Sequence, residues 1–181
     1  MRPTEELMNE HRQIERMLRI LSVAADRLDR GEVVDKELFI NACDFFKNFA
    51  DKCHHGKEET LLFEKMMEHG VSGEVGPIAV MLREHQDGRA HVKKMAELSD
   101  GALDKKAAND LVLHARGYVD LLSQHIQKED NVLYPMANSL LTQEDQQELE
   151  KGFEKVEKES MGPGVHEKYT KMIARWEQEY E

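Results

Sequence analysis

The sequence predicts an all-α protein, an antiparallel up-and-down four-helix bundle with a C-terminal helical extension. Apolar residues recur at spacings of three and four along four long segments, which is typical of helices that bury one face. Short loops separate these segments, and no stretch keeps the alternation of a strand. With 181 residues, 34% charged and 40% hydrophobic, the chain is long enough for one domain with a buried core.

Four long helices are expected before residue 140, over residues 4–31, 35–70, 77–98 and 105–138. Thr4 and Asp35 are candidate N-caps of the first two, because their side chains can accept a hydrogen bond from a free backbone N–H in the first turn. Pro77 can open the third helix, since the first helical position needs no backbone N–H. Pro135 is expected to bend or end the fourth helix, because it lacks that group.

Residues 1–140 are expected to form the bundle and residues 141–181 the extension. Thr142 followed by Asp145 resembles a capping box that opens a fifth helix, and a turn at 160–164 precedes a sixth. Each extension helix carries an apolar stripe, made of Leu149, Phe153 and Val156 in one and of Tyr169, Trp176 and Tyr180 in the other. These stripes are expected to pack on the bundle; the alternative is a surface for a dimer or another partner.

Composition and charge argue against several classes of protein. The net charge of −11 disfavours binding to nucleic acid, which needs a cationic surface. No apolar run is long enough for a membrane span, and the charged N-terminus does not resemble a signal peptide. Cys43 and Cys53 lie ten residues apart in one expected helix, a rise of about 15 Å that is too long for a disulfide. The expected location is the cytoplasm.

Each of the four long helices interrupts its apolar stripe with a histidine, and two add a glutamate one turn later. The six residues are His11, His54, Glu58, His85, His125 and Glu129. A single such histidine is ordinarily a satisfied core residue, but one in every helix is hard to reach by chance. Two buried carboxylates would cost several kcal/mol each without compensation, and Arg89 is the one clear counter-charge on the stripes. A metal ion supplies that compensation, since neutral imidazoles and ionised carboxylates are its ligands.

An internal repeat predicts how many metal ions there are. The stretch "HHGKEETLLF" (54–63) aligns without gaps on "HIQKEDNVLY" (125–134), and "EH" at 10–11 recurs at 84–85. The chain therefore looks like a duplicated helix pair, in which each half gives one histidine and then a histidine with a glutamate. Two such halves meeting in a bundle predict a dinuclear centre, with the glutamates placed to bridge. Nitrogen and oxygen ligands favour iron or manganese over a structural zinc site, and zinc stays an alternative.

The four motifs "EHRQIE", "HHGKEE", "EHQDGR" and "HIQKED", the last followed by "VLYPMA", resemble those of hemerythrin-like proteins, the HHE cation-binding domains. The resemblance covers about residues 5–138. It implies a four-helix bundle around two non-haem iron ions bridged by carboxylates and an oxo or hydroxo group. On this resemblance the six residues of the four stripes are the ligands.

Two departures from the oxygen carriers of that family affect the expected function. The carriers have a second histidine four residues after the one on the third helix, where this sequence has Arg89. They also place an aspartate five residues after the last histidine, whereas here Glu129 lies four residues after it and Asp130 follows. Six protein ligands in place of seven leave one iron with an open or water-filled position. This favours redox, peroxide, nitric oxide or iron-sensing chemistry over reversible oxygen carriage.

The predicted function is therefore a di-iron protein that binds or senses O2, NO or iron, and the alternative is an enzyme that reduces or detoxifies peroxide, O2 or NO. The expected partners are such small molecules, with no nucleic acid or membrane, and a homodimer is an open alternative. A ferritin-like oxidase is disfavoured, because no histidine has a glutamate three residues before it. A structural helical adaptor without metal leaves the interrupted stripes unexplained.

The other histidines near these motifs are expected to stay off the metal. His55 and Glu59 point about 100° away from their neighbours on an α-helix, so hydrogen bonds to ligands or exposure to solvent are expected. Glu59 and Asp130 occupy matching places and can accept hydrogen bonds from the free imidazole nitrogens. His91 lies on a different face from His85, and His114 is about 16 Å of rise from His125.

Overall fold

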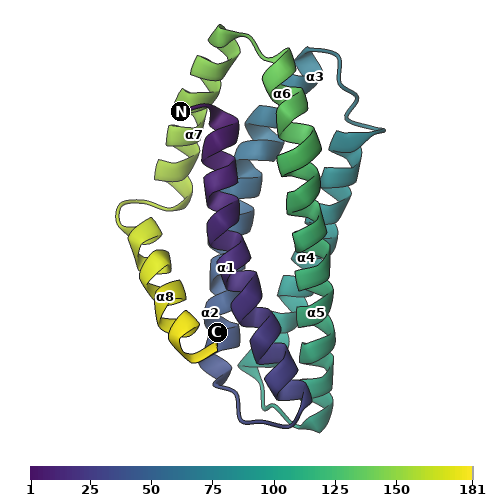
Figure 1. Cartoon of the computed structure of the whole chain (residues 1–181), viewed down its shortest axis with the longest axis vertical. Helices are drawn as coiled ribbons and strands as arrows, with labels where there is room; N and C mark the ends of the chain where they lie inside the picture. Colours follow the sequence, from purple (N-terminus) through teal and green to yellow (C-terminus); the bar gives the residue numbers. More distant parts are fainter. Residues whose placement is uncertain (181) are drawn as a thin grey trace.

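The computed structural model describes residues 1–180, which contain helices and no strand. Four long helical segments run up and down, and two further helices lie along one side of them (Figure 1). The elements are α1 Pro3–Asp29, α2 Lys36–Phe45, η1 Phe46–His55, η2 Glu58–Leu62, α3 Phe63–Glu68, α4 Pro77–Asp100, α5 Lys105–Lys128, η3 Glu129–Leu133, α6 Tyr134–Leu140, α7 Gln143–Ser160 and α8 Val165–Tyr180. The segments labelled η are π-helical.

The four long segments close into a ring. The first segment, α1, packs against α5 and η1, and the third, α4, packs against α5 and α2. Each segment therefore has its two neighbours in the ring, and the chain reverses direction through short loops after α1, α3 and α4. The predicted all-α, antiparallel bundle is confirmed.

The second and fourth segments change their winding where the sequence predicts continuous α-helix. In the second, η1 and η2 take over from α2, and in the fourth, η3 follows α5. π-Helical turns are rare and are found frequently at functional sites. Pro135 lies in the first turn of α6 directly after η3, where a missing backbone N–H is tolerated. The fourth segment therefore continues past Pro135 to Leu140.

Two of the three expected N-caps are confirmed. The Asp35 side chain accepts a hydrogen bond from the Glu37 backbone N–H, and Thr142 forms a capping box with Asp145. The assignment of Thr4 as a cap is wrong, because α1 already begins at Pro3. Thr4 instead donates a hydrogen bond of 2.9 Å to Asn138 Oδ1, which ties the start of α1 to α6.

Thr142→Ala is expected to lower the free energy of unfolding by about 1 kcal/mol, because it removes the acceptor for a free N–H at the start of α7. Chemical denaturation measures the change. Thr170→Ala is the control, since this exposed residue bonds through its hydroxyl only within α8 and should change the free energy by less than about 0.5 kcal/mol. Equal effects at the two positions would contradict the capping role.

Two apolar clusters fill the bundle, and the extension helices contribute to both. Leu149 and Phe153 of α7 join the cluster that contains Leu7. Residues of α8, Trp176 among them, join the larger cluster around α1 and α2. Both cysteines lie in this larger cluster as free thiols. None of the described helices is long and apolar enough to cross a bilayer.

Candidate metal centre

The six residues that interrupt the apolar stripes meet in the middle of the bundle. They are His11 on α1, His54 on η1, Glu58 on η2, His85 on α4, His125 on α5 and Glu129 on η3. Each is at most 1% exposed. The centre lies between the two apolar clusters, since Leu7 of one and Ile14 of the other flank His11 on the same helix. Burial of two carboxylates in such a place needs a compensating positive charge.

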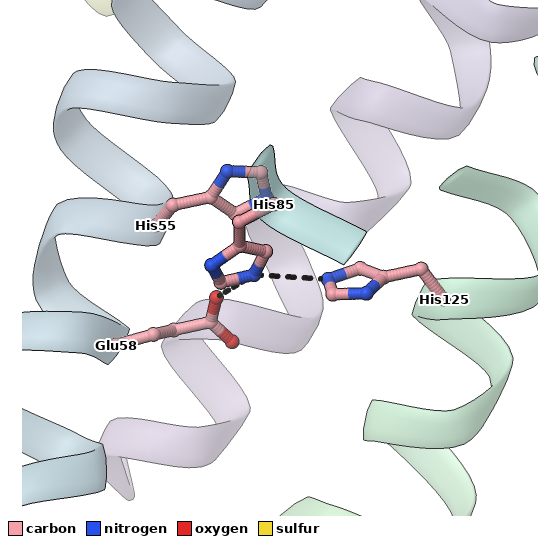
Figure 2. A group of neighbouring side chains, drawn as sticks. All are labelled: His55, Glu58, His85 and His125. Atoms are coloured by element: carbon pink, nitrogen blue, oxygen red, sulfur yellow. Dashed lines mark hydrogen bonds and ion pairs between the residues drawn. The ribbon is translucent and has the colours of Figure 1, made fainter. Parts of the chain in front are cut away.

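The donors form two groups that share a glutamate. The first group is His11, His54, Glu58 and Glu129, and the second is His55, Glu58, His85 and His125. Within each group, one ligand atom per residue lies within 4.8 Å of the others. Figure 2 shows the second group, in which the side chains from separate segments converge. The first group therefore holds His11 and His54 of the first half of the repeat. The second holds His85 and His125 of the second half together with His55 of the first, and Glu58 belongs to both groups.

Glu129 lies between histidines from the two halves. Its Oε2 is 3.1 Å from His11 Nε2, and its Oε1 is 3.1 Å from His125 Nε2. Short as these contacts are, neither oxygen has a partner in hydrogen-bond geometry within residues 1–180. Carboxylate oxygens and imidazole nitrogens that lie this close without a hydrogen bond between them are arranged like the ligands of a common cation.

Glu58 has one oxygen held by the protein and one left over. Its Oε1 accepts a hydrogen bond of 2.6 Å from the Tyr134 hydroxyl. Its Oε2 is 3.4 Å from His85 Nε2 and 3.8 Å from His54 Nε2. In the described chain, neither this oxygen nor His54 Nε2 has a hydrogen-bond partner. Glu58 therefore also spans the two halves, as the sequence predicts for a bridging carboxylate.

Each of the four histidines among these six residues donates its Nδ1 proton to a carboxylate. The pairs are His11 with Asp130 (2.7 Å), His54 with Glu10 (2.8 Å), His85 with Glu59 (2.7 Å) and His125 with Glu84 (2.9 Å). Such a bond fixes the tautomer and leaves the Nε2 lone pair for an ion. The predicted bonds of Glu59 and Asp130 are confirmed. The parts played by Glu10 and Glu84 were missed, although the repeated "EH" is their signal.

These carboxylates follow the internal repeat. Glu10 and Glu84 each orient a histidine of their own half, whereas Glu59 and Asp130 each orient a histidine of the other half. Each of the first two is also paired with a lysine at a matching position. Lys57 donates to Glu10 Oε1 at 2.6 Å, and Lys128 donates to Glu84 Oε1. In each half, therefore, a lysine donates to the glutamate that orients a histidine of that half.

A further cluster, made of acidic groups alone, surrounds a lysine side chain. Glu6, Glu10 and Glu157 come close enough to hold a cation, but their oxygens surround Lys57 Nζ at 2.7, 2.6 and 3.4 Å. Lys57 is fully buried. Although burial opposes its charge, Glu10 raises the pKa of Lys57 above its ordinary value.

The remaining histidines lie outside both groups. His91 Nδ1 and His114 Nδ1 are 3.1 Å apart, so these two residues pair with one another between α4 and α5. His69 and His166 each use Nε2 in an ion pair, with Asp145 and Glu157 respectively. None of the four points a nitrogen into the centre.

The chain matches the family model described as "Hemerythrin HHE cation binding domain" over residues 2–137, which covers the four-segment bundle except for the end of α6 and includes all six buried donors. The chain belongs to the hemerythrin HHE cation-binding family.

Relatives of this HHE chain include "Uncharacterized protein Rv1995" of Mycobacterium tuberculosis and "Uncharacterized protein Mb2018" of Mycobacterium bovis. Each is 22% identical over 172 residues, which cover 94% of this chain and 67% of the relative. "Iron-sulfur cluster repair protein YtfE" of Pectobacterium atrosepticum is 31% identical over 88 residues, 46% of this chain and 40% of that protein.

The donors of this HHE chain fit a metal site. They are imidazole nitrogens and carboxylate oxygens, and several of these atoms are buried without a hydrogen-bond partner in the described chain. A divalent cation would satisfy those atoms and neutralise the glutamates, as metal ions do where carboxylates cluster. The residues present therefore fit the cations that this family binds.

Burial and neighbouring charges shift the pKa values of the donors in this HHE centre. Burial and the negative charge of Glu129 raise the pKa of Glu58 well above its usual range. Burial also opposes the charge of Glu129, but His125 outweighs it and lowers the pKa of Glu129. Although burial opposes the charge of His125, Glu129 raises the pKa of His125 to about 9. Burial lowers the pKa of His54. Metal binding must displace protons from this centre.

The structure rules out one of the two places that the sequence allows for His55. The sequence predicts a hydrogen bond to a ligand or exposure to solvent, and exposure is wrong, because His55 is only 5% exposed and lies in the second group of candidate donors. Its ring is stacked on His85 with centroids 3.8 Å apart. Arg89, at the position of the family's seventh ligand, instead donates to Asp51 and Glu59. The signal in the sequence is the doublet His54–His55, which the matching stretch at residue 125 lacks.

A cavity of about 810 Å³ leads from the surface to this HHE centre. It lies between the α2–η1 segment and α4, and its lining includes His55, His85 and Arg89 together with exposed residues such as Lys47 and Lys93. The cavity therefore reaches two residues of the second group of donors, His55 and His85.

Proposed function

We propose that this chain is a non-haem di-iron protein that binds or senses a small molecule such as O2 or NO, or iron itself. One observation carries the proposal: two buried glutamates lie between two pairs of histidines, with unpartnered oxygens directed at the histidine Nε2 atoms. Each half of the repeat supplies two of these four histidines and one of the glutamates, which supports two ions. A non-haem iron pair supplies redox-active metal with positions open to small ligands.

The choice of iron rests on the donor chemistry. The groups contain imidazole and carboxylate and no thiolate, which favours iron or manganese over a structural zinc site. The name of the Pectobacterium relative, an iron–sulfur cluster repair protein, also supports chemistry that involves iron. Manganese and zinc are the alternatives that metal analysis must test. A cytoplasmic location stays a prediction.

A second candidate is an enzyme that reduces or detoxifies peroxide, O2 or NO. Tyr134 favours it, because this fully buried hydroxyl donates to Glu58 Oε1 and lies 3.3 Å from His11 Nε2. Burial and the charge of Glu129 raise the pKa of Tyr134 well above its usual range, so the proton stays on the oxygen. Tyr134 can therefore position Glu58 and hold a proton beside the ions.

Metal analysis of the purified protein tests the di-iron proposal. Two iron ions per chain are expected, with a near-ultraviolet charge-transfer band after aerobic loading of the ferrous form. Iron, manganese and zinc are counted on the same sample. A colourless protein with one zinc ion per chain would overturn the proposal.

Gas exposure separates binding from turnover. A spectral change of the ferrous protein on adding O2 or NO that reverses under vacuum supports binding or sensing. Irreversible oxidation with consumption of peroxide, O2 or NO supports the enzyme. Tyr134→Phe then tests the enzyme reading directly, since it should slow turnover while the two metal ions stay bound.

A further inference from the structure

We propose that His55 is a metal ligand, which gives the ion held by His85 and His125 a third imidazole. The inference rests on the proposed dinuclear site and adds a residue that the family motif does not supply. In the oxygen carriers that this chain resembles, the extra histidine comes from the third helix, where Arg89 stands here. In this chain the extra imidazole comes from the second helical segment.

The position of His55 is that of a donor to the second ion. One of its ring nitrogens lies within 4.8 Å of the ligand atoms of Glu58, His85 and His125. The ring stacks on His85 at an interplanar angle of 16° and makes an edge contact with His125, with centroids 5.8 Å apart. Figure 2 shows the ring of His55 beside that of His85.

The hydrogen bonding of His55 matches that of the other four donors. Its Nδ1 lies 3.3 Å from Asp51 Oδ1, so Nε2 is the nitrogen left for an ion. The histidines outside the centre are bound differently: two pair through Nδ1 with one another and two use Nε2 in ion pairs. An Nδ1 bond to a carboxylate thus marks the five histidines of the two donor groups.

Arg89 supports this arrangement from the position of the missing ligand. Its Nε donates to Asp51 Oδ1 at 2.8 Å, and its Nη2 donates to Glu59 Oε1 at 2.7 Å. These are the carboxylates that orient His55 and His85. Burial opposes the charge of Asp51, but the bonds from His55 and Arg89 hold the pKa of that carboxyl at about 2. Arg89 is therefore a positioning residue for two imidazoles.

The repeat shows that His55 is specific to one half. The residue that matches it is Ile126, which is buried in the larger apolar cluster. The ion beside His11 and His54 therefore has two imidazoles, whereas the ion beside His85 and His125 has three. We expect the two metal positions to differ in affinity and in spectrum.

His55→Gly in the full chain tests the assignment through metal retention. After loading with ferrous iron, a chelator should remove one of the two ions at least about tenfold faster than from the unaltered chain. Free imidazole should restore slow release, because the cavity opens beside the missing ring and an imidazole molecule can ligate the ion directly. His91→Gly is the matched control. It should release both ions to the chelator at the rate of the unaltered chain, with or without imidazole.

The outcomes separate this inference from the proposed function. If the unaltered chain does not hold two metal ions, the dinuclear proposal fails. If it does, and His55→Gly releases both ions at the unaltered rate, the ligand role of His55 is overturned. Fast release that imidazole does not slow also overturns the ligand role, since a free ligand cannot replace a residue that only packs beside the ion. Circular dichroism of the metal-free forms checks folding, and His55→Ala is measured if glycine disrupts η1.

Discussion

Glu129→Gln is expected to empty the metal centre and to abolish most of the rise in melting temperature that metal gives the unaltered protein. Glu129 touches histidines from both halves, so its loss weakens both positions. An amide has the size of the carboxylate but neither its charge nor its second acceptor oxygen. A metal that binds only the folded state stabilises it by about 2.7 kcal/mol at a free concentration one hundred times its dissociation constant.

Thermal denaturation with and without iron measures this effect, and metal counting on the same samples measures occupancy. His91→Ala and His114→Ala are the controls, because these residues pair with one another and belong to neither donor group. Both controls should keep two ions and the full rise in melting temperature. A Glu129→Gln chain that still holds two ions with the same gain would remove Glu129 from the ligand set.

Lys57→Met is expected to destabilise the fold by about 3–5 kcal/mol, the usual cost of removing one partner from a buried ion pair. Methionine keeps most of the apolar stem but leaves Glu10 without its lysine. Burial already raises the pKa of Glu10, so the unpaired carboxyl becomes protonated. His54 then loses a charged acceptor at Nδ1, and metal affinity should fall with stability.

Lys128→Met is the matched control that the repeat provides. Lys128 makes the equivalent bond to Glu84, but its side chain is 42% exposed, and an exposed pair contributes at most about 1 kcal/mol. Chemical denaturation of the metal-free proteins compares the two. A loss at Lys57 no larger than that at Lys128 would show that the buried lysine is not needed to balance the acidic groups around it.

Much of the fold and of the centre follows from the sequence because both depend on spacing. Apolar residues at intervals of three and four define a helix face, and a histidine or glutamate on that face must enter the core. The repeat of "EH" and of the later motif then gives two equal sets of donors. The π-helical winding of η1, η2 and η3 does not follow, since side-chain spacing does not fix which backbone carbonyl each N–H bonds.

The place of His55 does not follow from spacing either. Neighbours on a helix point about 100° apart, which predicts that only one of His54 and His55 faces the core. The second segment lies between α1 and α4, so each direction leads into the bundle. His54 joins His11 of α1, and His55 joins His85 of α4. Which neighbour lies on which side is set by tertiary packing.

The crossed support of the histidines bears on how such a chain could arise. Glu59 orients His85 and Asp130 orients His11, so a lone helical hairpin would leave one of its imidazoles without its carboxylate. Two identical hairpins meeting face to face would supply both bonds, which makes a symmetric dimer of half-length chains a competent ancestor. Ile126 at the position that matches His55 is where the two halves of this chain differ in the donors they offer.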